Sequence, residues 1–253
     1  MLKKIKIIFV MLCITLSGCA SHQGPNLIEK NPVHDPYEGW NRGVFAVNVV
    51  LDDYLLSPTA QAYNFAVPGV VKYIISNELD YIQTPVSLLN TILQGDMQAF
   101  EHVLSRFIIN TTLGGLGLLD AATELGYPRH REDFAQTLAV WGVDNGPYLV
   151  APFFGPTTLR GVGGQVVDIF SDPLTYSTGD TAMVGIIALG VGAVSFRANN
   201  YETINGLRAS SEDYYATLRS IYIQQRNANI QNLNLNPKDE FIDFSAYDEE
   251  DEE

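Results

Sequence analysis

The feature that most restricts the fold is an apolar run, from Met183 to Phe196, that contains no charged residue and has no polar face. A helix that is apolar on every side has to be buried in a protein core or in lipid. Its 14 residues are too few for a comfortable membrane span, so the run fits a core helix or an embedded segment. The pattern alone slightly favours burial in a protein core.

Helical signals also dominate the middle of the chain. Thr84-Pro85 predicts the start of a helix, and Gly95 predicts its end. Asp96 then begins a second helix, whose apolar residues recur every three or four positions and share one face. That face contains Met97, Phe100, Leu104, Phe107 and Ile108.

Three more helices follow from the same kind of pattern. Asp133 begins a short one that Gly142 ends, and another runs from near Thr157 to Phe170. The segment Leu207–Gln225 is predicted as a single helix. Its apolar stripe contains Leu207, Tyr214, Leu218, Ile221 and Tyr222. Strand-like alternation is scarce and no repeat is evident, so the predicted fold class is all-α.

A glycine-rich segment, Thr111–Gly117, interrupts the apolar stretch Phe107–Leu119. Each glycine costs a helix about 1 kcal/mol relative to alanine. Three glycines within four residues therefore argue against a rigid helix at this point.

The N-terminus has the pattern of a bacterial lipoprotein signal. Three lysines precede an apolar run from Ile7 to Leu16, which is about half the length of a membrane-spanning helix. Leu16-Ser17-Gly18-Cys19 then resembles a lipobox, in which the cysteine is acylated after cleavage. Residues 1–18 are predicted to be the signal peptide, and Ala20 favours sorting to the outer membrane.

Composition limits what the mature chain can do. Cys13 is removed with the signal and Cys19 is acylated, which leaves no thiol for a disulfide, a metal site or catalysis. Removal of three lysines lowers the basic residues from 15 to 12 against 29 acids, a net charge of −17. Nucleic acid should repel so acidic a chain.

The two ends differ from the body in composition. Residues 19–34 mix polar residues, glycine and proline, and are predicted to form a tether between the lipid anchor and a body at 35–228. Residues 229–253 are rich in asparagine and end in a run of acids, so they are predicted to form a disordered tail.

The sequence contains no motif of a phosphate-binding loop, a nucleophile elbow, a zinc protease or a dinucleotide site. Its histidines are scattered, so no metal site is expected. They are His22, His34, His102 and His130. No catalytic residue is predicted, although a pair of carboxylates of the glycosidase type stays open among so many acids.

One face of the helix near Thr157–Phe170 contains Arg160, Gly164 and Asp168. Glycine lets another body approach a helix closely. Tight packing against a neighbouring helix, with both charges paired, is the favoured explanation. A smooth wall for an acyl chain, with a charge for a phosphate at its rim, is the alternative.

Several separate blocks of residues follow one another through the body. They are Asp35–Arg42 (DPYEGWNR), the spaced residues Phe45, Asn48, Asp52, Tyr54, Pro58 and Tyr63, then Leu93–Asp96 (LQGD), Arg106-Phe107, Asn110-Thr111, Gly114-Gly115-Leu116, Phe134–Leu138 (FAQTL), Gly142-Val143, Gly146–Tyr148 (GPY), Pro152–Arg160 (PFFGPTTLR) and Gly163-Gly164. Together they resemble the MlaA (VacJ) family of outer-membrane lipoproteins, from Asp35 to Arg226.

The resemblance implies a transport protein without catalysis. Its members form a ring of helices around an amphipathic channel in the inner leaflet of the outer membrane. They associate with trimeric porins, remove misplaced phospholipid from the outer leaflet and pass it to a soluble periplasmic carrier. No cofactor is implied apart from the acyl groups on Cys19 and the transported phospholipid.

Under this resemblance the apolar segments become membrane-embedded helices, and the glycine-rich segment becomes a flexible element beside the channel. The candidate channel-lining residues are Gly114, Gly115, Leu116, Arg160, Gly164 and Asp168. Two other functions stay open. One is a structural lipoprotein that scaffolds an outer-membrane complex, and the other is a lipid hydrolase that uses an unrecognised carboxylate pair.

Overall fold

The computed structural model describes residues 34–172 and 181–232, and this part of the chain is mostly helical. Its elements are α2 (Glu38–Leu51), η1 (Asp52–Leu56), α3 (Ser57–Ala66), α4 (Gly69–Gln94), α5 (Met97–Thr112), α6 (Ala121–Glu124), α7 (Phe134–Val140), β1 (Tyr148–Ala151), β2 (Gly155–Thr158), α8 (Leu159–Ser171), α9 (Thr181–Asn199), α10 (Tyr201–Ser210) and α11 (Tyr214–Ile230). The predicted signal peptide, Cys19, most of the tether and the tail from residue 233 lie outside the described residues.

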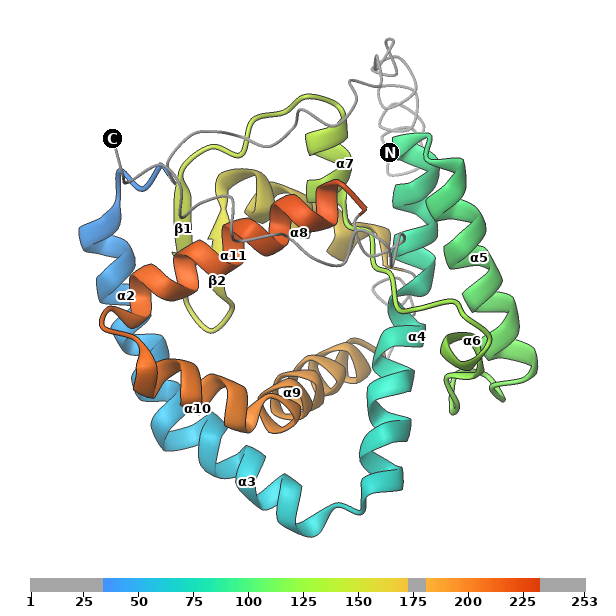
Figure 1. Cartoon of the computed structure of the whole chain (residues 1–253), viewed down its shortest axis with the longest axis horizontal. Helices are drawn as coiled ribbons and strands as arrows, with labels where there is room; N and C mark the ends of the chain where they lie inside the picture. Colours follow the sequence, from blue (N-terminus) through green and yellow to red (C-terminus); the bar gives the residue numbers. More distant parts are fainter. Residues whose placement is uncertain (1–33, 173–180, 233–253) are drawn as a thin grey trace, which may run out of the picture.

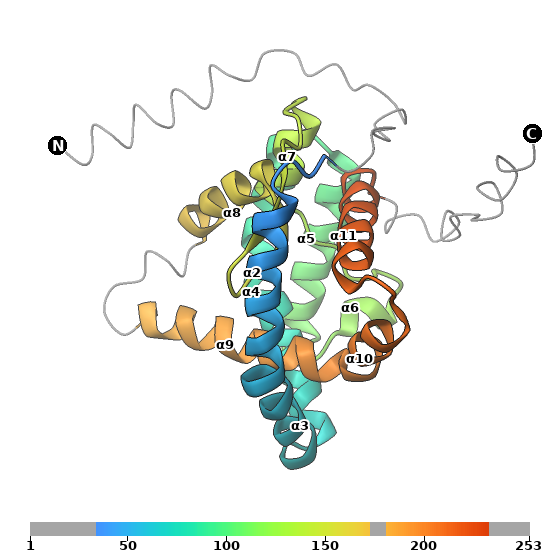
Figure 2. The same ribbon diagram turned by 90° about the vertical axis from the view of Figure 1, so that its left-hand side faces the viewer.

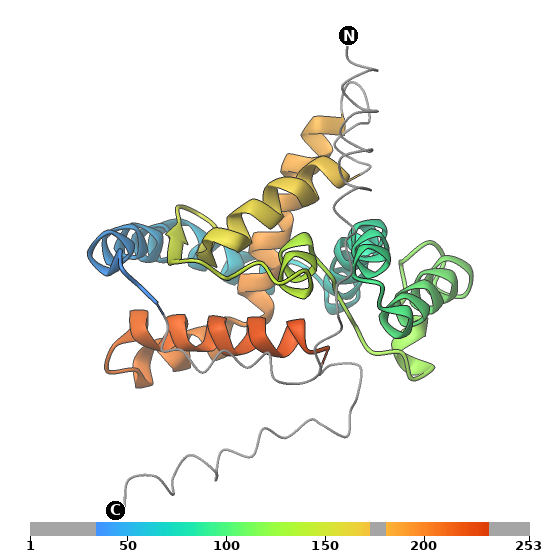
Figure 3. The ribbon, with the colours of Figure 1, turned by 90° about the horizontal axis from the view of Figure 1, so that it is seen from above.

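The helices are arranged as a ring. In Figure 1, α2, η1 and α3 follow one side, α4 follows the opposite side, and the hairpin with α7 and α8 completes the circuit. Helices α5 and α6 lie outside α4. Figures 2 and 3 show that α8 and α9 project from one face of the ring, whereas α10 and α11 lie against the other.

A β-hairpin is the one departure from the all-α prediction in the described part of the chain. Strands β1 and β2 pair antiparallel, with Tyr148 opposite Thr158 and Ala151 opposite Gly155. Two asparagines of α2 replace a third strand. The Asn41 side chain donates to Tyr148 O and accepts from Val150 N, both at 3.0 Å. The Asn48 side chain donates to Ala151 O at 3.0 Å and accepts from Phe153 N at 2.9 Å. Side-chain amides of α2 therefore stabilise this short hairpin.

Several predicted helix ends are confirmed, and each of them has a capping residue. Gly95 adopts a left-handed conformation (φ 71°) at the end of α4, and the Asp96 carboxylate accepts from Ala99 N at the start of α5. Asp133 caps α7 by accepting from Gln136 N. Helix α8 begins at Leu159, where the Thr158 hydroxyl accepts from Gly161 N.

Two predicted boundaries are wrong. Pro85 lies inside α4, which begins at Gly69, because packing against α5 and α7 supports a helix that proline alone would interrupt. The predicted helix Leu207–Gln225 is two helices. Asp213 caps the second by accepting from Ala216 N, so Leu207 belongs to α10 and not to the stripe of α11. Helix α11 then continues to Ile230.

The predicted apolar face of α5 is only partly buried. Phe100, Leu104 and Phe107 are half-buried, and the Phe107 ring stacks on Tyr81 of α4 with 5.5 Å between the ring centroids. Met97 is 72% exposed and Ile108 is 52% exposed, whereas Arg106 and Asn110, on another face, are buried. Large apolar side chains are exposed elsewhere too, with Phe65 at 95% and Tyr54 at 83% exposure. Among the described residues, buried polar side chains outnumber buried apolar ones. Such a surface is unusual for a protein surrounded by water.

The apolar run Met183–Phe196 lies in α9. This helix contacts α3 and α4 and projects from one face of the ring (Figure 2). Ile187 and Leu189 are more than half exposed, whereas Ser195 and Arg197, near the end of the helix, are buried. The run is therefore partly a core element and partly an exposed apolar surface. No helix in the described part of the chain combines the length and apolar character that crossing a membrane requires.

Candidate functional site: the ring of helices

Ion pairs join the first and last helices of the described body. Asp35, which precedes α2, accepts from the Arg219 guanidinium of α11 at 2.8 Å and from the Tyr215 hydroxyl. Burial alone would raise the pKa of Asp35, but the hydrogen bonds from Tyr215 and Arg219 lower it. Arg42 of α2 also pairs with Asp213 at the start of α11, at 2.6 Å. These contacts hold α11 against the start of α2, on one face of the ring (Figure 3).

The π-helix η1 supplies a second junction. The wider turn places Asp52 and Asp53 next to two arginines of later helices. Asp52 accepts from Arg197 of α9 at 2.8 Å, and Asp53 accepts from Arg208 of α10 at 2.5 Å. The Arg197 side chain is only 4% exposed, so this buried ion pair holds the C-terminal end of α9 against η1.

Two candidate residues of α8, Gly164 and Asp168, contact other helices of the protein. A Cβ on Gly164 would lie 2.4 Å from Ala135 N, so α8 and α7 approach too closely for a side chain. Asp168 accepts from Phe134 N and from Asn90 Nδ2 at 3.1 Å. Burial raises the pKa of Asp168. Helix packing, the favoured explanation from the sequence, therefore accounts for Gly164 and Asp168.

Arg160 lies at the start of the same helix, and its Nη1 donates to Val143 O at 2.8 Å. This contact fixes the side chain against the segment between α7 and β1. A role of Arg160, Gly164 and Asp168 in lining a lipid route stays a prediction.

The glycine-rich segment forms a packed turn between α5 and α6, on the outer side of α4 (Figure 1). Gly115, Leu116 and Gly117 have positive φ angles of 63°, 63° and 98°. Leu116 N donates to Thr111 O at 3.1 Å. A Cβ on Gly114 would lie 2.3 Å from Leu119 O. The predicted break in the helix is confirmed, and the turn has hydrogen bonds of its own. Channel lining by Gly114, Gly115 and Leu116 stays a prediction.

A buried charge cluster connects α4, α5 and α6. The Arg106 side chain, 7% exposed, lies 3.1 Å from Asp120 Oδ1 and 3.5 Å from Asp80 Oδ2. Asp120 also caps α6 through Thr123 N and accepts from Asn110 Nδ2. No pattern in the sequence predicted this cluster. The spacing of Asp120 and Thr123 is an N-cap pattern that would have located α6, but no local signal pairs Asp120 with Arg106.

The ionisation of Asp120 makes the fold sensitive to acid. Burial alone would raise its pKa, but hydrogen bonds from Thr123 and Asn110 and the charge of Arg106 lower it from 3.8 to about 2. A lowered pKa stabilises the fold above the unfolded-state value, and this stabilisation is lost as the pH falls from about 4 to about 2. The expected loss is about 2 kcal/mol.

Chemical denaturation between pH 2 and pH 6 measures this effect. The difference in unfolding free energy between the wild type and Asp120→Asn should be large at pH 6 and shrink by about 2 kcal/mol at pH 2. A difference that stays constant over this range would contradict the assignment.

Histidines and carboxylates do not form a metal site in residues 34–172 and 181–232, where no group of three or more potential ligands is placed to hold an ion. His130 Nε2 lies 2.8 Å from Glu132 Oε1, and both side chains are buried. His102 Nε2 bonds Pro128 O at 2.8 Å. These two histidines thus have structural contacts.

Comparison with known proteins identifies the family. A model described as "MlaA lipoprotein" matches residues 33–229. An uncharacterized protein of Rickettsia felis is 36% identical over 200 residues, 79% of each chain. The intermembrane phospholipid transport system lipoprotein MlaA of Escherichia coli (strain K12) is 33% identical over 229 residues, 88% of each chain.

A solved structure described as "Structural basis for maintenance of bacterial outer membrane lipid asymmetry" is similar with a TM-score of 0.69 and 34% identity. The match covers 78% of this chain and 98% of that one. Fold and sequence thus agree on a class of bacterial lipoproteins. The chain belongs to the MlaA lipoprotein family, which confirms the resemblance found in the sequence.

Proposed function

We propose that the protein removes misplaced phospholipid from the outer leaflet of the outer membrane and passes it to a soluble periplasmic carrier, and so maintains lipid asymmetry. The observation that carries this proposal is the inverted surface of the ring. Large apolar side chains are exposed while arginines and carboxylates are buried at the helix junctions. The names of the relatives, which include an intermembrane phospholipid transport lipoprotein, support the same function.

The exposed apolar surface suits a position within one leaflet. Helices α8 and α9 project from the same face of the ring (Figure 3), and both expose apolar side chains. These include Ile169, Phe170, Ile187 and Leu189, each more than half exposed. Burial of apolar surface stabilises by about 25 cal/mol per Å², so these helices favour contact with acyl chains over water. An acylated Cys19 would add a covalent anchor at the same membrane.

The ring provides a route without chemistry. Transfer of a lipid headgroup from water to an apolar medium raises its free energy, so a polar path past the membrane core lowers the barrier. Acyl chains can remain in apolar surroundings during the same passage. In this mechanism Arg160 is the candidate contact for the headgroup phosphate. Direction comes from the periplasmic carrier, and a trimeric porin holds the ring in place.

The test is deletion of the gene, followed by measurement of the phospholipid that an added phospholipase can reach on intact cells. Surface phospholipid should rise, and the wild-type gene should reverse the rise. Cys19→Ala removes the acylation site, so it should fail to reverse the rise even when the protein is made in equal amount.

Three results would contradict the proposal or one of its parts. No rise after deletion, with the protein present in the parent's outer membrane, would favour a structural role as a scaffold. Full complementation by Cys19→Ala would show that the acyl anchor is dispensable. Release of fatty acid from vesicles by the purified protein would favour a hydrolase.

A further inference from the structure

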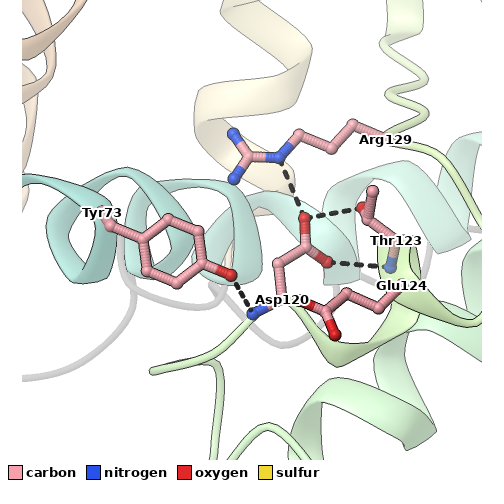
Figure 4. A pocket seen from close by; sticks show the side chains of 5 residues that line it. All are labelled: Tyr73, Asp120, Thr123, Glu124 and Arg129. Carbon is pink, nitrogen blue, oxygen red and sulfur yellow. Dashed lines mark hydrogen bonds and ion pairs between the residues drawn. The ribbon is translucent and has the colours of Figure 1, made fainter. Parts of the chain in front are cut away.

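A pocket of about 370 Å³ lies between α4 and α6 (Figure 4), and α6 lies on the outer side of α4 in Figure 1. Its lining residues are Tyr73, Asp120, Thr123, Glu124 and Arg129. The volume is at the small end of the range for ligand sites, large enough for a lipid headgroup but not for a whole lipid. In Figure 4, Tyr73 and Arg129 flank the pocket, and the carboxyl groups of Asp120 and Glu124 lie between them.

The two carboxylates of the pocket are not equivalent. The carboxylate oxygens of Asp120 already accept hydrogen bonds from the protein. Their donors are Arg129 Nε at 3.2 Å, Thr123 Oγ1 at 2.7 Å and Arg106. Glu124 is exposed, and its side chain makes no hydrogen bond or ion pair with any residue in the described ranges. Glu124 therefore supplies an available negative charge, which suits an ammonium group.

Two donors face the same pocket. Arg129 uses Nη1 for Ser76 Oγ and Nη2 for Asn77 Oδ1, and each of these nitrogens carries a second hydrogen. The Tyr73 hydroxyl accepts from Asp120 N at 3.1 Å, which leaves its proton for another acceptor. A guanidinium and a hydroxyl are well suited to bind phosphate oxygens.

Three exposed apolar residues lie close to the lining residues in the sequence, and they define what is called the apolar rim. Val70 lies one helical turn before Tyr73 and is 71% exposed. Leu119 and Leu125, which adjoin Asp120 and Glu124, are 53% and 57% exposed. Charged groups in the pocket, with exposed apolar residues close to them in the sequence, match a headgroup attached to acyl chains better than a soluble zwitterion.

We propose that this pocket binds the headgroup of an amine-bearing zwitterionic phospholipid from the surrounding leaflet. Glu124 binds the ammonium group, Arg129 and Tyr73 bind the phosphate, and the acyl chains lie over Val70, Leu119 and Leu125. The inference rests on the proposed function, because it takes the apolar exterior to be in contact with lipid. It adds a headgroup preference and a binding site on the outer wall of α4.

The test compares two lipids with identical acyl chains, phosphatidylethanolamine and the anionic phosphatidylglycerol. Each is titrated against the full-length protein in a non-ionic detergent, and bound lipid is counted by native mass spectrometry. The wild type should prefer phosphatidylethanolamine. Glu124→Gln should reduce this preference about fivefold, the factor that one partly exposed ion pair supplies. Glu124→Lys should reverse the preference.

Three further arms separate the roles. Glu101→Gln alters an exposed acid of α5 away from the pocket and should leave the preference unchanged. Tyr73→Phe keeps the ring but removes a phosphate donor, so it should weaken both lipids equally. Glycerophosphoethanolamine, which has no acyl chains, should compete poorly because it cannot contact the apolar rim.

Each outcome bears on the pocket alone. Equal binding of the two lipids by the wild type, or an unchanged preference in Glu124→Gln, would overturn the proposal. Strong competition by glycerophosphoethanolamine would assign the pocket to a soluble ligand. A chain that restores lipid asymmetry in cells but shows no headgroup preference would leave the proposed function intact and remove this site.

Discussion

Replacement of Asp120 by alanine is expected to destabilise the protein by about 3–5 kcal/mol, the cost of leaving a buried charge without its partner. Arg106 is almost fully buried, and its remaining carboxylate, Asp80, is 3.5 Å away. The substitution also removes the N-cap of α6 and the bond from Arg129. Chemical denaturation of the purified protein in detergent measures the change in unfolding free energy.

The matched control is Asp53→Ala. Asp53 also pairs with an arginine, Arg208, but both side chains are about 40% exposed. Exposed pairs contribute at most about 1 kcal/mol, so this variant should be far less affected. The double variant Asp120→Ala, Arg106→Met should recover part of the loss, because it removes the unpaired charge. Equal losses in Asp120→Ala and Asp53→Ala would contradict a buried role for the cluster.

Replacement of Gly164 by alanine is the second substitution with a large expected effect. The added Cβ would lie 2.4 Å from Ala135 N and 2.6 Å from Ala135 Cβ. Backbone atoms cannot move out of the way cheaply, so α8 would have to separate from α7. Overpacking of this kind costs about 1–3 kcal/mol, and we expect the upper end of that range. Thermal unfolding in detergent should show a midpoint lower by roughly 4–12 °C.

Gly163→Ala provides the control within the same helix. Nothing lies within 4 Å of the Cβ that this substitution adds. Alanine favours a helix by about 1 kcal/mol over glycine, so Gly163→Ala should be neutral or stabilising. A similar loss in both variants would mean that the helix backbone, and not its contact with α7, is sensitive to substitution at these positions.

Local signals in the sequence predicted the parts of the fold that local chemistry determines. Gly95 and Asp96 separate α4 from α5 because a left-handed residue and a capping carboxylate act within a few residues. Pro85 misled the prediction, because tertiary packing decides whether a helix continues through a proline. The hairpin was missed because its edge is bonded by Asn41 and Asn48, which lie more than 100 residues earlier.

The direction of each helix face could not be predicted from periodicity alone. The spacing of apolar residues correctly defines one side of α5, but only part of that side is buried: Phe107 stacks on Tyr81, whereas Met97 is 72% exposed. The rule that an apolar side faces the core assumes water outside. The candidate site shows the same limit. Sequence geometry placed Gly164 and Asp168 on one helix face, and only the structure shows that this face meets α7. The pair of Arg106 and Asp120 follows from the turn between α5 and α6, which brings them together.

The contact between Asp35 and Arg219, which holds α11 against the start of α2, has a consequence for how the protein is made. These partners are separated by 184 positions, and Arg197 and Asp52 by 145. Contacts between such distant residues are slow to form, because the intervening chain must first be ordered. An exported chain emerges from its N-terminus, so Asp35 has no partner until α11 has been translocated. Throughout that interval the exposed apolar side chains have neither α11 nor a membrane beside them, so under the proposed function a chaperone of the periplasm should bind the chain until its last helix arrives.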